Sequence, residues 1–121
     1  MKNLLNSMLE NTMEGTLKHE VVEIILSEIE GIEEDEILST VEEIVTYGCQ
    51  SGIVSALITC SDTELFFDKH ANEIFELVED AKQEGIIDMN NFELSKNNLA
   101  WFAFETRAQE IYQEMEYATE F

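Results

Sequence analysis

Apolar residues recur every three or four positions along most of the chain, and this spacing predicts amphipathic helices. Two stripes come first, over residues 4–13 and 17–29, and each is followed by a glycine, Gly15 and Gly31, that would end a helix. Acidic residues at 33–36 then open a third helix, because carboxylates favour the positive end of a helix macrodipole. The stripe positions are Leu4, Leu5, Met8, Leu9 and Met13; Leu17, Val21, Ile24, Ile25 and Ile29; and Ile37, Val41, Ile44, Val45 and Gly48.

The second half of the chain predicts two longer helices. Ser61 and Glu64 have the spacing of a capping box, and a helix follows them until Gly85. Its inner face consists of Phe66, His70, Ile74, Leu77, Val78 and Ala81.

A loop is predicted over residues 86–94, and Ser95 is positioned to cap a last helix over about 96–117. Apolar residues surround its segment Leu99–Phe104 on nearly every side, which predicts a central position. We expect this segment to pack on the 66–78 stripe and on residues 48–52.

The stretch Tyr47–Gly52 is small and nearly uncharged. It is either a break between helices or a helical segment in which backbones approach closely, because glycine permits both. Residues 53–58 continue it as a buried apolar piece.

These patterns together predict an all-α fold. Proline is absent and the five glycines lie mostly between the stripes. We expect a compact single-domain bundle of five or six helices over residues 1–121, with the helix in 1–14 at its periphery.

Charge excludes several classes of function. The chain has 27 Asp and Glu against 6 Lys and Arg, a formal net charge of −21. A protein that binds nucleic acid directly needs clustered cations to neutralise phosphates, so that class is excluded. Anionic lipid would repel the chain, and neither an apolar run of membrane-spanning length nor a signal peptide is visible. We therefore expect a cytoplasmic protein, monomeric or homodimeric.

The residues that could perform chemistry have simpler interpretations. His19 and Glu23 are spaced like two metal ligands on one helix face, but no third ligand accompanies them, so His19 is interpreted as a helix-surface histidine beside carboxylates. His70 is interpreted as a half-buried, hydrogen-bonded side chain. Cys49 and Cys60 are expected to be buried free thiols, and the acidic surroundings of Cys49 disfavour a reactive thiolate. We predict no catalytic residues, no metal and no cofactor.

The distribution of charge carries more information than any motif. Residues 19–68 contain thirteen acids and no Lys or Arg, although helices usually intersperse the two signs. Solubility explains a smaller excess than this. The densest patch is predicted to bind a partner with a basic surface, and it consists of Glu30, Glu33, Glu34, Asp35, Glu36, Glu42 and Glu43.

Three stretches together give a resemblance: Tyr47–Val54, Ser61–Thr63 with Phe67–His70, and Asn98–Glu105 with its tryptophan. This combination resembles an uncharacterised family of small acidic proteins carried by bacteriophages and other mobile elements, over about residues 17–112. The helix in residues 1–13 lies outside the shared part. The family has no established activity, so the resemblance implies no catalytic residues. It implies a mobile-element protein that acts in a bacterial cytoplasm.

Charge and context lead to the same hypothesis. Small acidic phage proteins often block defence enzymes that handle nucleic acid, such as CRISPR effectors or restriction enzymes. We expect a non-enzymatic inhibitor of this type that occupies a basic groove by mimicking nucleic acid. The alternatives are a mobile-element regulatory or assembly adaptor that binds a protein through an apolar patch, and an enzyme that uses Cys49.

Overall fold

The computed structural model describes residues 2–47, 60–85 and 96–119, and every element in these ranges is helical. They contain α1 (Lys2–Asn11), α2 (Leu17–Glu28), the 3-10 helix η1 (Glu34–Glu36), α3 (Ile37–Tyr47), α5 (Cys60–Gln83) and α6 (Lys96–Thr119). The prediction of an all-α fold is confirmed.

Contacts divide the chain into two units. One unit combines Met1–Leu57 with Phe104–Phe121, and the other is Ile58–Ala103. The helix α6 is continuous across the boundary, so its first two turns belong to one unit and its remainder to the other. That residues 1–121 form a single domain stays a prediction.

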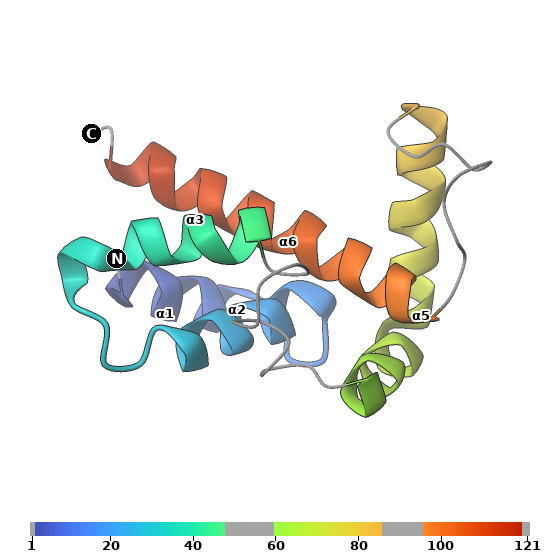
Figure 1. Cartoon of the computed structure of the whole chain (residues 1–121), viewed down its shortest axis with the longest axis horizontal. Coiled ribbons are helices and arrows are strands. Elements are labelled where there is room, and N and C mark those ends of the chain that lie inside the picture. The colour runs from blue at the N-terminus through green and yellow to red at the C-terminus, as the bar shows by residue number, and fades with distance from the viewer. Residues whose placement is uncertain (1, 48–59, 86–95, 120–121) are drawn as a thin grey trace. The chain divides into compact units, whose positions relative to one another are not determined.

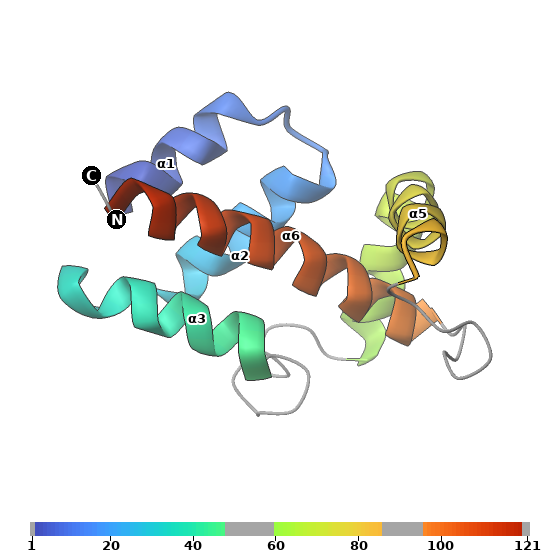
Figure 2. The ribbon, with the colours of Figure 1, turned by 90° about the horizontal axis from the view of Figure 1, so that it is seen from above.

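In the first unit, α1, α2, α3 and the C-terminal part of α6 surround one apolar core. Seen from above, this part of α6 runs between α1 and α3 and over α2 (Figures 1 and 2). The side chains that these helices bury almost completely are Leu5, Leu17, Val21, Val22, Ile25, Ile29, Ile37, Val41, Ile44, Phe104, Ala108, Ile111 and Met115. Most of them lie on the predicted stripes, because burying the apolar face of each helix is the main source of stability available to it. In α2, however, Val22 is fully buried and the predicted stripe position Ile24 is only half-buried.

The N-terminal stripe is wrong at its last position. Leu5 is fully buried and Met8 nearly so, but Met13 is 77% exposed. The helix α1 ends at Asn11, so Met13 lies in the turn that follows and no longer shares a face with Leu5.

In the second unit, α5 buries the predicted inner face. Phe66, His70, Ile74, Val78 and Ala81 are buried, and Leu77 is half-buried. The helix begins at Cys60, within two residues of the predicted start. The Ser61 and Glu64 side chains lie outside what the structure describes, so the capping box stays a prediction.

The helix α5 is also kinked, which the sequence does not predict. His70 has non-helical angles, φ −120° and ψ 22°, and the segments before and after it point in different directions (Figure 1). The imidazole is 3% exposed, so it is more deeply buried than the predicted half-buried side chain, and its ring centroid lies 5.1 Å from that of Phe66.

The segment Leu99–Phe104 is only partly as central as predicted. Leu99, Ala100, Ala103 and Phe104 are buried, whereas Trp101 and Phe102 are half-buried. The predicted contact with residues 48–52, the buried piece 53–58, the loop 86–94 and the Ser95 cap lie outside the described residues.

Gly31 permits a test of how the turn after α2 is built. Its φ is +83°, and a Cβ added there would meet nothing within 4 Å. Gly31→Ala should therefore cost only the left-handed backbone penalty, about 1–2 kcal/mol of unfolding free energy. Urea denaturation measures this, and Gly31→Asn should cost less because asparagine tolerates this region. An alanine variant as stable as the wild type would contradict the turn geometry.

Candidate acidic interface

The acidic residues predicted to bind a partner form a continuous segment in the first unit, which we call the acidic cluster. Glu30 lies in the turn after α2, Glu33 precedes η1, η1 is Glu34–Glu36, and Glu42 and Glu43 lie in the middle of α3. All seven side chains are exposed.

Buried apolar residues at both ends of the turn direct these carboxylates outward. Ile29 and Ile37 are fully buried. Between them the backbone closes two tight turns, in which Ile32 N–H donates to the Ile29 carbonyl at 2.9 Å and Glu36 N–H donates to the Glu33 carbonyl at 2.9 Å. The two buried isoleucines and these backbone hydrogen bonds thus hold the acids between them in solvent.

The acids of η1 have a structural role of their own. Glu34, Asp35 and Glu36 form this 3-10 turn, which runs directly into α3, and carboxylates at this end stabilise the helix through its macrodipole. Glu42 and Glu43 are beyond that turn, so the macrodipole does not account for them.

Glu34 also reaches the start of α1. The positive amino group at the start of the chain lowers the pKa of Glu34 by a hydrogen bond, and the backbone N–H and ammonium group of Lys2 act in the same direction. A carboxylate from η1 thereby satisfies the N-terminal end of another helix, where backbone donors have no partner within the helix.

A second group of acidic residues links α3 to α6. The Tyr112 hydroxyl donates to Glu116 Oε2 at 3.0 Å. This bond, followed by partial burial, the charge of Glu116 and the nearby Glu42, raises the pKa of Tyr112 to about 12. The acidic cluster therefore continues, through Glu42, onto the exposed end of α6.

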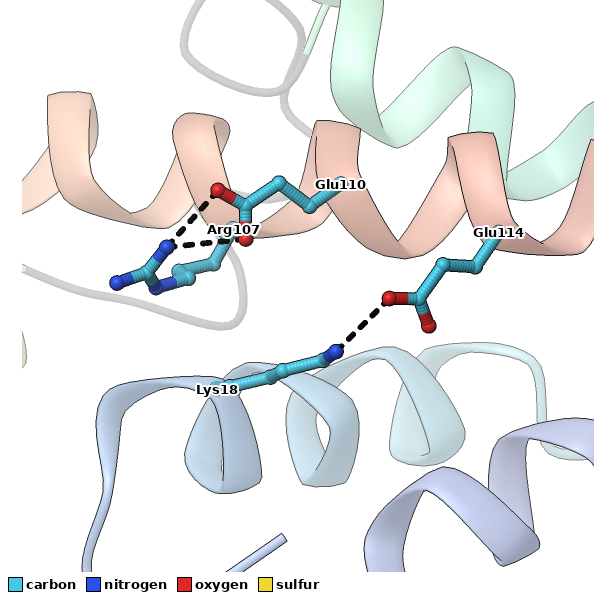
Figure 3. Close-up of polar contacts among 4 residues, drawn as sticks. All are labelled: Lys18, Arg107, Glu110 and Glu114. Carbon is cyan, nitrogen blue, oxygen red and sulfur yellow. Dashed lines mark hydrogen bonds and ion pairs between the residues drawn. The ribbon is translucent and has the colours of Figure 1, made fainter. Parts of the chain in front are cut away.

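Cations are engaged elsewhere in the same unit. Lys18 Nζ pairs with Glu114 Oε1 at 3.0 Å, and Arg107 Nη1 contacts both oxygens of Glu110 at 2.8 and 2.9 Å (Figure 3). Lys18 comes from α2, so its pair with Glu114 joins α2 to α6. Neither pair involves a residue of the acidic cluster.

His19 lies beside a carboxylate, as predicted, but also contacts a hydroxyl. Its Nε2 is 2.9 Å from Glu23 Oε1, and its Nδ1 is 3.0 Å from Thr12 Oγ1. The side chain is 14% exposed, less than a surface histidine. Hydroxyl, imidazole and carboxylate in series are the components of a nucleophilic triad.

The hydrogen bonds show what this series does here. Thr12 Oγ1 also donates to the Leu9 carbonyl at 3.1 Å, and with its proton used there the hydroxyl accepts from Nδ1 in the tautomer that carries a proton on that nitrogen. These contacts join the turn after α1 to α2.

The sequence predicts the acidic cluster, but it does not predict the contacts that link the cluster to other helices. The four-residue spacing of Tyr112 and Glu116 is a helical signal that could have identified their hydrogen bond. Nothing in the sequence indicates that Glu42 approaches Tyr112 or that Glu34 approaches Lys2, because these contacts join separate helices.

Other candidate chemistry is limited. Cys49 lies outside the described residues. Within the described ranges, no group of three or more His, Cys, Asp or Glu side chains is arranged to hold a metal ion. No helix in these ranges combines the length and apolar character needed to cross a bilayer.

In a comparison with known protein families, residues 6–117 match the family described as Domain of unknown function (DUF7222). The match begins within α1, so the expectation that residues 1–13 lie outside the shared part is wrong from residue 6 onward. No curated protein and no solved structure shows significant similarity to the chain.

Tyr112 gives a pH prediction. Its pKa is raised to about 12, above the usual value near 10, so the hydrogen bond contributes stability below pH 10 that is lost as pH rises through about 12. Absorbance titration of tyrosinate, with Tyr112→Phe to identify the signal, measures this. Glu116→Gln should move the titration back toward 10. Ionisation of Tyr112 near pH 10 in the folded wild type would contradict the assignment.

Glu34 gives a prediction with the opposite sign. Because its pKa is lowered in the folded state, its contribution is present above the ordinary glutamate value and is lost as pH falls through the folded pKa. Glu34→Gln should reduce stability at pH 7 and flatten the acid limb of the pH profile. Glu33→Gln is the matched control, because Glu33 makes no side-chain capping bond. Equal profiles for both variants would rule out the role of Glu34.

Proposed function

Since the chain belongs to the family described as Domain of unknown function (DUF7222), a description without an activity, we propose its function from its charge and surface. We propose that it is a non-enzymatic inhibitor of a bacterial defence protein that handles nucleic acid, of the anti-CRISPR or anti-restriction type. It binds a basic groove of that protein through the acidic cluster, as a mimic of nucleic acid. It acts for a phage or mobile element in the bacterial cytoplasm, as a monomer or homodimer.

The observation that carries this proposal is the exposure of all seven carboxylates on one folded segment. The partner's Lys and Arg, which normally hold phosphates, can reach each of them without unfolding the chain. Complementary charge of this kind accelerates encounter and selects the partner. Because the local fold already positions the backbone that carries the acids, binding has to order their side chains but not that backbone.

Glu42 and Glu43 distinguish a partner-binding role of the acidic cluster from a purely structural one. They gain nothing from the macrodipole, and Glu42 lies near the carboxylate of Glu116 through their shared neighbour Tyr112. Like charges held near one another cost stability. A basic partner would bind more tightly to such repelling carboxylates than to carboxylates already neutralised by a cation, because its own cations relieve the repulsion.

The adaptor remains the second candidate, because large apolar side chains are also exposed. Met13 is 77%, Leu65 65%, Tyr117 64% and Phe75 53% exposed. An adaptor that binds through such residues would hold its partner at high salt, whereas binding through carboxylates weakens as salt screens them.

Charge reversal at Glu42 and Glu43 tests the inhibitor. Glu42→Lys with Glu43→Lys changes the net charge from −21 to −17 and leaves the first turn of α3 intact. Proteins captured from a bacterial lysate at low salt and released at high salt are assayed for DNA or RNA cleavage with the added chain. The wild type should inhibit cleavage, and the reversed variant should inhibit at least about tenfold less, since loss of close charge pairs costs on the order of 1.5 kcal/mol or more.

Two controls accompany this assay. Glu10→Lys with Glu14→Lys makes the same change in net charge outside the cluster and should keep inhibition. Cys49→Ala should also keep it, because the proposal assigns no chemistry to that thiol. Full inhibition by the Glu42 and Glu43 variant would refute binding through the acidic cluster, and loss of inhibition in Cys49→Ala would favour an enzyme.

A further inference from the structure

An aromatic ring stands exposed on α5, in the unit Ile58–Ala103. Phe75 is 53% exposed, although most other large apolar side chains of this helix are buried. It lines a shallow hollow of about 380 Å³ together with Glu76, Glu79 and Asp80. Phe75 and Glu79 are four residues apart, as are Glu76 and Asp80, so the four side chains lie in two neighbouring rows along one side of α5.

The ring is held in place from behind. Phe67, which is 7% exposed, contacts Phe75 edge to face, with the ring centroids 5.6 Å apart and the planes at 86°. An exposed side chain fixed by a buried neighbour loses little freedom on binding, so it is suited to be an anchor.

The carboxylates around this ring differ from those on α6. Glu76, Glu79 and Asp80 are exposed, and no ion pair joins them to a cation among the described residues. A second hollow, of about 400 Å³, is lined by Glu110, Gln113, Glu114 and Tyr117, but its two glutamates already pair with Arg107 and Lys18. The two hollows therefore have similar volumes and an aromatic ring each, and they differ in whether their carboxylates pair with a cation.

We propose that the Phe75 hollow is a second contact for the basic partner and that it takes an arginine side chain. This rests on the proposed function, which supplies a partner with exposed cations. The guanidinium plane stacks on the exposed face of Phe75, and its N–H groups donate to the neighbouring carboxylates. Lysine fits less well, because its compact ammonium cannot both stack as a plane and donate to two carboxylates.

Binding of an arginine homopeptide to the full chain, followed by NMR, tests this site without the natural partner. Nuclear Overhauser effects should connect arginine Hδ protons to the Phe75 ring. Phe75→Ala should weaken binding about two- to fivefold, the effect of an exposed cation–π contact. Tyr117→Ala, in the compensated hollow, should leave affinity unchanged, and a lysine homopeptide of equal length should be insensitive to Phe75→Ala.

The results separate this inference from the proposed function. Unchanged arginine affinity in Phe75→Ala, or an equal loss in Tyr117→Ala, would overturn the arginine site whatever the acidic cluster does. If Phe75→Ala weakens the peptide while reversal of Glu42 and Glu43 leaves inhibition intact, the arginine site stands and the proposed inhibitor mechanism fails.

Discussion

Burial of apolar stripes holds this chain together against its own charge. With 27 acids and 6 bases, most neighbouring charges repel, and two like charges about 4 Å apart in water cost roughly 1 kcal/mol. The core must supply the opposing free energy. His70 is the one polar side chain buried among the described residues, and every carboxylate of the acidic cluster is left in solvent. Apart from His70 the described core is apolar, so the charged side chains lie at the surface, and the excess of acids makes that surface anionic.

Acidic residues in this protein contribute to stability only at particular positions. Glu34 completes the start of α1, and the start of α3 gains from the carboxylates of η1, which precedes it directly. Glu110 and Glu114 neutralise two of the few cations. Glu42 meets the Tyr112 hydroxyl but no cation, and Glu43 and the acids around Phe75 pair with no cation among the described residues. The two proposed contacts use these uncompensated positions, one in each unit.

Much of this arrangement could be predicted from periodicity. Ile25, Ile37 and Ile44 are buried because they recur at helical spacing, and the acids between them are exposed for the same reason. Gly31 marks a turn because only a residue without a side chain adopts its φ cheaply. Met13 was misplaced because the helix ends two residues before it, and the stripe alone does not show where a helix ends.

Contacts between helices could not be predicted. The kink at His70 has no proline or glycine to signal it. The approach of Glu34 to Lys2, of Thr12 to His19 and of Glu42 to Tyr112 depends on how helices pack, which a single sequence does not encode locally. The acidic cluster could be predicted as a group because its members lie close together in sequence. The Phe75 hollow could not, because the sequence pattern does not indicate that the Phe75 ring is exposed beside its carboxylates.

Hydrogen exchange of the chain with and without its salt-released partner tests the central claim most directly. The account predicts that binding slows exchange of backbone amides across η1 and α3, the segment that bears the acidic cluster. Unchanged exchange there, with slowing confined to the exposed apolar residues, would contradict it.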